Sequence, residues 1–221
     1  MKAIKNYIFQ HFETLFPLFL VTAFSLFLLM IRLKVTHSFF FSFLVWNLFL
    51  AFIPFIISFY LRQQQKPSKI KVLIGFCTWL LFLPNAPYLI TDLIHLRHSG
   101  PVQIWLDMVM ISLFAIGGLL CYSISMQQME VVVAKFIKKQ DVVLLFVSIH
   151  FLTGFGIYLG RFLRFNSWDI VQNPMFLISE ISQIVLFPMQ HKIAWTITLF
   201  FGLFLWGIFL YLKRRTLRFF N

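Results

Sequence analysis

Six long runs of apolar residues, separated by short polar segments, take up most of this 221-residue chain. Each run is close to the roughly 20 apolar residues that an α-helix needs to cross a bilayer. A helix satisfies its backbone hydrogen bonds within itself, as the hydrocarbon interior requires. We therefore expect residues 1–221 to form one integral membrane domain, an all-α bundle of six transmembrane helices. The expected spans are about 15–31, 39–61, 72–90, 104–126, 142–160 and 193–212.

One further apolar segment, residues 174–187, is shorter than the six spans. At a rise of 1.5 Å per residue it forms a helix of only about 21 Å, which is too short to cross the bilayer comfortably. Pro174 suits the first position of a helix, and Glu180 falls on a polar side of it. We therefore expect an amphipathic helix that lies in the outer interface.

The basic residues predict the orientation, because Lys and Arg accumulate in short cytoplasmic loops. With the N-terminus inside and six spans, 13 of the 19 basic residues fall on the cytoplasmic side. The six on the outside are Arg32, Lys34, Arg97, Arg161, Arg164 and Lys192. A seventh span would move the basic tail at 213–218 to the outside. We therefore expect both termini to be cytoplasmic and the protein to lie in the cell (cytoplasmic) membrane.

The composition agrees with this class of protein. Sixty per cent of the residues are hydrophobic, 31 are Phe, and the mean hydropathy is +0.86, more than a soluble domain of this size can bury. Basic loops lying against anionic lipid headgroups explain the net charge of +12. Because these residues are spread over several loops, the expected partners are membrane lipids and not nucleic acid. Cys77 and Cys121 fall within spans as small hydrophobic residues and not as a metal pair. Asp92 and His95 could bind a divalent metal, but two ligands are too few, so no metal or cofactor is expected.

Polar residues gather in two stretches at the expected outer face, residues 83–101 and 160–173. In the first stretch, Pro84 ends or kinks the preceding helix and Asn85 is a candidate N-cap. Beyond them, Asp92 and His95 lie three residues apart on the polar side of an amphipathic helix. A carboxylate and an imidazole within reach of one ligand make these two the candidate catalytic residues.

The second stretch carries Arg161 and Arg164, again three residues apart, followed by Asn166 and Asp169 at an expected helix start. Asp107 lies just inside the outer end of the fourth span, where an ionised group needs a partner. Arg161 or Arg164 is the expected partner. The two arginines then have two open interpretations: they clamp a phosphate, or they form structural ion pairs with Asp92, Asp107 or Asp169.

These two stretches also resemble known segments. Residues 82–88 (FLPNAPY) with 92–96 (DLIHL), and 160–164 (GRFLR) with 166–169 (NSWD), are similar to signature segments of a bacterial family of unknown function. Members of that family are polytopic membrane proteins of about this length. The resemblance covers most of the chain from the second span onward. It implies a membrane protein of this class, and it implies no activity.

We hypothesise an extracytoplasmic polar site that binds or processes an anionic, lipid-linked ligand. The ligand-binding candidates are Asn85, Asp107, Arg161, Arg164, Asn166 and Asp169, and the catalytic candidates are Asp92 and His95. Two alternatives are a small transporter or channel subunit, which needs a polar path, and a non-catalytic assembly partner in which the cluster is an ion-pair lock. No nucleotide-binding glycine loop, nucleophile elbow or zinc-protease helix occurs, so enzymatic activity stays an open question.

Overall fold

The computed structural model describes residues 12–219, and this part of the chain is helical without strands. Lys2 and Lys5, which the charge argument placed on the cytoplasmic side, lie outside the described residues. Six helical segments in the described part are long and apolar enough to cross a membrane, as the sequence predicts. They are α2 (Phe12–Thr36), α3 (Phe43–Gln63), Lys69–His98, α6 (Ile104–Val133), α7 (Lys139–Arg161) and α10 (Lys192–Phe219).

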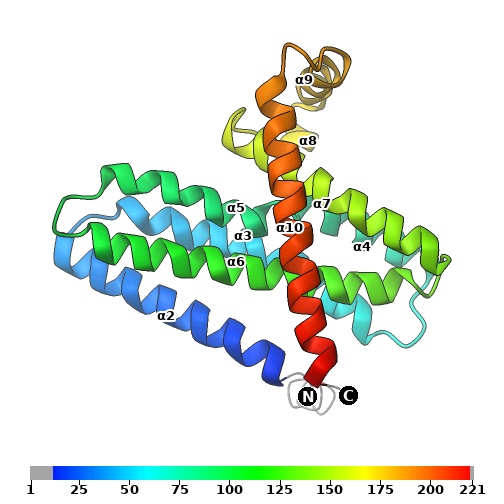
Figure 1. The fold of residues 1–221 in the computed structure, drawn as a ribbon, viewed down its shortest axis with the longest axis horizontal. Coiled ribbons are helices and arrows are strands. Elements are labelled where there is room, and N and C mark those ends of the chain that lie inside the picture. The colour runs from blue at the N-terminus through cyan, green and yellow to red at the C-terminus, as the bar shows by residue number, and fades with distance from the viewer. Residues whose placement is uncertain (1–11, 220–221) are drawn as a thin grey trace.

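Helix α6 lies at the centre of the molecule, with α3 above it, α2 below it and α10 crossing in front of it (Figure 1). Its most buried side chains include Met110, Phe114 and Tyr122, all with no exposed surface. Helix α10 packs mainly against α7 and crosses α6 steeply (Figure 1). Gly154 and Gly202 let α7 and α10 approach closely, because a Cβ at either position would overlap atoms of the other helix.

The third span is broken at Pro84, as the sequence predicts. Helix α4 (Lys69–Phe82) ends just before this proline, and the short α5 (Asn85–Tyr88) and the 3₁₀-helix η2 (Leu89–His98) follow it. The prediction that Asn85 is an N-cap was wrong. Leu83 and Pro84 both keep helical backbone angles, so Asn85 is the first residue of α5, and its side chain donates back to the carbonyl of Phe82 at 3.0 Å.

Two glycines let neighbouring helices pack against this break. A Cβ at Gly118 of α6 would overlap the carbonyl oxygen of Ala86, and one at Gly156 of α7 would lie 2.5 Å from Cγ of Pro84. The broken segment is therefore enclosed by α6 on one side and α7 on another. Backbone groups freed by a break within a membrane need such cover, since lipid offers them no hydrogen bonds.

The two ends of the bundle differ in their charged residues. The turn between α2 and α3, with the 3₁₀-helix η1 (Phe40–Ser42), lies beside the turn that leads into α6. We call this the arginine end, because it carries Arg32 and Arg97. The opposite end holds the α3–α4 and α6–α7 turns. We call it the lysine end, because it carries Lys66, Lys69, Lys71, Lys135, Lys138 and Lys139.

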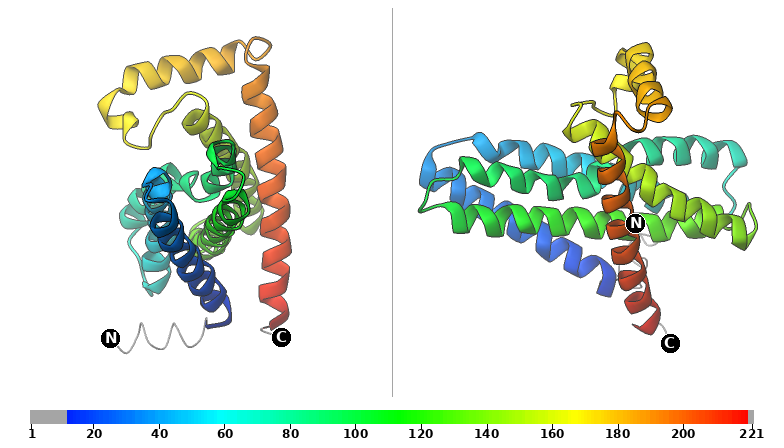
Figure 2. Two further views of the ribbon diagram at one scale, coloured as in Figure 1. Left: turned by 90° about the vertical axis from the view of Figure 1, so that its left-hand side faces the viewer. Right: turned by 45° about the horizontal axis from the view of Figure 1, so that its top comes forward.

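The segment between α7 and α10 forms α8 (Asp169–Gln172) and α9 (Pro174–Leu186). Helix α9 is too short for a span and lies across the start of α10 (Figure 2). Ile184 anchors it, with a side chain that is 1% exposed and packs near Tyr158 and Ala194. The indole of Trp195 donates to the carbonyl of Ile184 at 3.3 Å. Pro174 begins the helix as expected.

Candidate functional site

Asp92 and Arg161 form an ion pair between η2 and the end of α7, in which the carboxylate is buried and the guanidinium is partly buried. Arg161 Nη1 lies 3.3 Å from Asp92 Oδ1, and Arg161 Nη2 donates to the carbonyl of Thr91 at 2.7 Å. Asp92 has no exposed surface. The sequence analysis gave two interpretations of Arg161, a phosphate clamp and a structural ion pair. The structure contains the ion pair with Asp92.

Two further side chains complete this pair. The amide of Asn47, on α3, donates to Asp92 Oδ2 at 2.9 Å, so each oxygen of the carboxylate has a partner. Arg161 Nη1 also donates to the hydroxyl of Tyr88 at 3.2 Å, and its guanidinium lies over the ring of Tyr88. Helices α3 and α7 and the broken third span are therefore tied together by one hydrogen-bonded group.

Asp107 pairs with Arg32, and the prediction that its partner is Arg161 or Arg164 was wrong. Arg32 Nε lies 2.5 Å from Asp107 Oδ1, and Nη2 lies 3.2 Å from Oδ2, so the guanidinium binds the carboxylate through two nitrogens. Arg32 comes from the last turns of α2, which packs directly on α6, whereas Arg161 is already held by Asp92. The expectation that a charge at this depth is paired was correct.

The remaining predicted residues do not join this centre. His95 packs against the rings of Phe40 and Phe43. Arg164 is exposed and has a φ of 61°, at a turn where the N–H of Phe165 donates back to Leu159. In the described part of the chain, no three His, Cys, Asp or Glu side chains gather as a metal-binding group.

Asn166 and Asp169 interact with each other at the start of α8. Asp169 Oδ2 accepts from the backbone N–H of Asn166 at 2.6 Å. The carboxylate therefore organises the beginning of this short helix, as its position three residues after Asn166 predicts. This contact holds Asn166 at the edge of the pocket described next.

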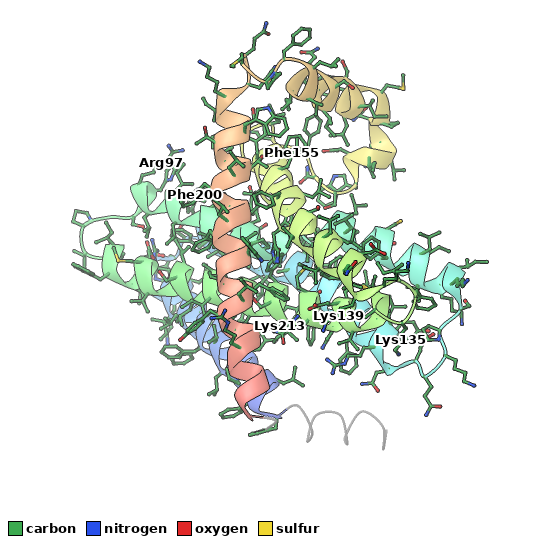
Figure 3. All side chains as sticks on the ribbon, turned by 45° about the vertical axis from the view of Figure 1, so that its right-hand side comes forward. Arg97, Lys135, Lys139, Phe155, Phe200 and Lys213 are labelled. Atoms are coloured by element: carbon green, nitrogen blue, oxygen red, sulfur yellow. The ribbon has the colours of Figure 1, made fainter. Side chains whose placement is uncertain are left out.

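A pocket of about 430 Å³ lies between α3, the break in the third span, α7 and α9. Its volume is within the range of small-molecule sites. The apolar lining comes from Trp46, Leu50, Leu80, Leu81, Pro84, Leu152, Phe155, Gly156, Leu159, Gly160, Phe165, Ile170, Leu177 and Ile181. Figure 3 labels Phe155 on the part of α7 below α9.

Five polar side chains line the pocket: Asn47, Asn85, Tyr88, Asn166 and Ser167. Asn47 and Tyr88 reach back to Asp92 and Arg161, which lie behind the pocket wall. Asn85 donates to Ser167 Oγ at 3.0 Å, which joins the break to the loop above it. Of the predicted site residues, only Asn85 and Asn166 are in the lining.

Sequence reasoning missed three of the pocket's polar residues, Asn47, Tyr88 and Ser167. Asn47 stands alone in an otherwise apolar stretch of the second span, and this isolation was a usable signal, because an amide at such a depth needs a partner. Tyr88 and Ser167 lie within the two polar stretches, but nothing in their spacing shows that they face a cavity.

Comparison with known proteins places the chain in a family. No curated protein and no solved structure matches it. A family model described as "Protein of unknown function (DUF1361)" matches residues 46–208, from α3 into α10. Because this match covers well over half of the chain, the protein belongs to the DUF1361 family.

Proposed function

We propose that this protein binds a lipid-linked ligand in the pocket between α3, α7 and α9. The observation that carries the proposal is the mixed lining of that pocket, whose walls are apolar while Asn47, Asn85, Tyr88, Asn166 and Ser167 converge on it. Ligand sites combine a mostly apolar surface with a few placed polar groups in this way. We further propose that this side of the protein faces the outer leaflet.

The apolar walls suit a hydrocarbon chain that enters from the bilayer. Trp46 on α3 and Leu152 on α7 line the pocket, yet they are 53% and 52% exposed. Both residues lie within the six spans, and exposed side chains of transmembrane helices face lipid. A lipid chain can therefore reach the pocket sideways, between α3 and α7, without leaving the hydrocarbon.

The polar groups suit a head that carries hydroxyls or amides. The amide nitrogens of Asn47 and Asn85 are used within the protein, and within the described residues their carbonyl oxygens accept no bond. Tyr88 accepts from Arg161, so its own proton is available to a ligand. The pocket thus offers both acceptors and a donor.

An anionic group on the ligand, such as a phosphate, would lie near Arg164 and Arg161. Arg164 is exposed and precedes the pocket residues Phe165, Asn166 and Ser167. Asp92 balances the charge of Arg161, so Arg161 adds little net charge to the site. Its contribution is the hydrogen bond that orients the hydroxyl of Tyr88. In the described residues, neither Asp92 nor His95 lines the pocket, and the proposal is therefore one of binding.

Native mass spectrometry of the detergent-purified protein tests the proposal. We expect a retained lipid whose occupancy falls at least tenfold in Leu152→Trp, because the larger ring fills the opening. Leu144→Trp is the matched control, since Leu144 is on the same helix, 70% exposed, and not part of the lining. Equal lipid retention in the two variants would contradict a ligand in this pocket.

The alternative role of an assembly partner is supported by a different observation, the two buried pairs Arg32–Asp107 and Arg161–Asp92. In that case the charges lock four helical segments together and the pocket has no occupant. Asn85→Ala separates the two roles, because Asn85 lines the pocket and belongs to neither pair. A loss of lipid at an unchanged protein level supports binding, whereas unchanged lipid retention supports the lock.

A further inference from the structure

A second concave surface lies at the lysine end, and it shares no lining residue with the first pocket. It is a groove of about 400 Å³ between the start of α4, the end of α6 and α7. Seven of its eight lining side chains are apolar: Val72, Leu73, Phe76, Val133, Phe136, Ile137 and Leu145. The eighth is Lys69.

The rim of this groove is strongly basic. Besides Lys69, the two turns that flank the groove and the helix ends next to them carry five lysines, all of them exposed: Lys66, Lys71, Lys135, Lys138 and Lys139. Figure 3 labels Lys135 and Lys139 at this end of the molecule. Within the part of the chain that the structure describes, no ion pair involves any of these six lysines.

The acidic residues nearby do not offset this charge. Asp141 is the only acidic residue in the segments 64–71 and 134–141, against six lysines. Glu130, one helical turn before the groove residue Val133, is bound by Lys213 of α10 at 2.5 Å. The surface therefore combines an apolar groove with an excess of positive charge at its mouth.

We propose that this groove binds one anionic glycerophospholipid, with an acyl chain along Leu73, Phe76 and Leu145 and the phosphate among the lysines. Charge complementarity selects this occupant. Basic pockets between transmembrane helices on the cytoplasmic side bind anionic headgroups, and lysines near a membrane surface attract such lipids. A zwitterionic lipid would gain the same contacts for its chain but lose the net attraction to the rim.

Titration of the delipidated full-length protein with phosphatidylglycerol and with phosphatidylcholine, followed by native mass spectrometry, tests this site. We expect phosphatidylglycerol to bind at least tenfold more tightly at low salt. Raising the salt concentration should reduce that preference. Lys69→Gln combined with Lys135→Gln should remove most of the preference, by about tenfold or more.

Two matched controls make the result specific. Lys34→Gln combined with Lys192→Gln removes the same charge from exposed positions outside the lysine end and should leave the preference unchanged. Leu73→Trp should weaken binding of both lipids by filling the groove. Ile74→Trp should not, because Ile74 is as exposed as Leu73 (62% against 63%) and does not line the groove.

Three results would overturn the proposal. These are equal binding of the two lipids by the unmodified protein, equal effects of the two lysine pairs, and phosphatidylglycerol binding that Leu73→Trp leaves unchanged. A lipid held in the pocket between α3, α7 and α9 does not affect the comparison, because none of the six substituted positions, four lysines and two apolar residues, lines that pocket.

Discussion

Asp107 and Asp92 have no exposed surface, and each is held by an arginine from another helix. A carboxylate in such a place is stable only when it is both paired and hydrogen-bonded, because burial removes its hydration. Arg32 meets Asp107 with two nitrogens, and Arg161 shares Asp92 with Asn47. These pairs set the position of α2 against α6, and of η2 against α7 and α3.

We predict that Asp107→Asn lowers the free energy of unfolding in detergent by about 3–5 kcal/mol, the usual effect of removing one partner of a buried pair. The substitution leaves the charge of Arg32 buried without its counter-ion. Thermal unfolding in detergent measures the effect. Asp141→Asn is the control, because Asp141 is exposed. Combining Asp107→Asn with Arg32→Gln should cost less than the two separate losses added together.

For the second pair, Arg161→Gln should destabilise the protein by a similar amount, about 3–5 kcal/mol. It removes the counter-ion of Asp92 and the bonds to Thr91 and Tyr88. Arg164→Gln, three residues away and exposed, should change the stability by less than about 0.5 kcal/mol. Equal melting temperatures for the two variants would contradict a structural role for the Arg161 pair.

At this scale the sequence predicts which residues need partners better than it predicts the partners themselves. The depth of Asp107 in its span already requires a counter-ion. Choosing between Arg32 and Arg161 depends on which helix packs against α6, and no spacing along the chain contains that information. Asp92 and Arg161 were predictable as a pair, since both belong to the polar stretches expected at one face.

The most distinctive element is the third span, which is divided into α4, α5 and η2. Pro84 predicts the break, but the 3₁₀ geometry that follows is not visible in the sequence. A 3₁₀-helix has three residues per turn, so residues three apart lie above one another. Asp92 and His95 thus share a side of η2, as predicted, yet only Asp92 reaches Arg161. His95 is nearer the arginine end, beside Phe40.

We predict that Gly118→Ala destabilises the protein by about 1–3 kcal/mol, the usual effect of overpacking. The added Cβ would overlap the carbonyl oxygen of Ala86, which is backbone and cannot rotate away. Gly207→Ala in α10 is the control, because a Cβ there has open space. Its stability should be unchanged or slightly higher, as alanine favours helix over glycine. Similar losses in both variants would show that α6 does not pack tightly on the break.

Across the whole molecule, the six spans were predictable because their length and apolar content follow from the thickness of a bilayer. The arrangement of the spans was not. Bundles usually pack at small crossing angles, whereas α10 crosses α6 steeply (Figure 1). The pocket below α9 depends on that arrangement, since Leu177 and Ile181 of α9 close it over residues of α3 and α7. The sequence therefore predicts some of the residues that line this pocket, but it does not predict how the helices arrange them around a cavity.

The distribution of basic residues predicts the orientation of the whole molecule in the membrane. We predict that both termini and the lysine end face the cytoplasm, by the positive-inside rule, and that α9 stays on the outer side. Lys213 near the end of α10 binds Glu130 near the end of α6, and this contact agrees with both helices ending on one side. Single cysteines in a background without Cys77 and Cys121 test the prediction in intact cells.

A cysteine at Met189, which is 79% exposed between α9 and α10, should react with a membrane-impermeant thiol reagent added outside. One at Gln65, exposed in the α3–α4 turn, should react only after the membrane is opened. If α9 crossed the bilayer, Met189 would lie on the cytoplasmic side, and Gln65 would still be cytoplasmic. Protection of both cysteines would therefore indicate a seventh span. Labelling of the Gln65→Cys variant alone from outside would indicate an inverted protein.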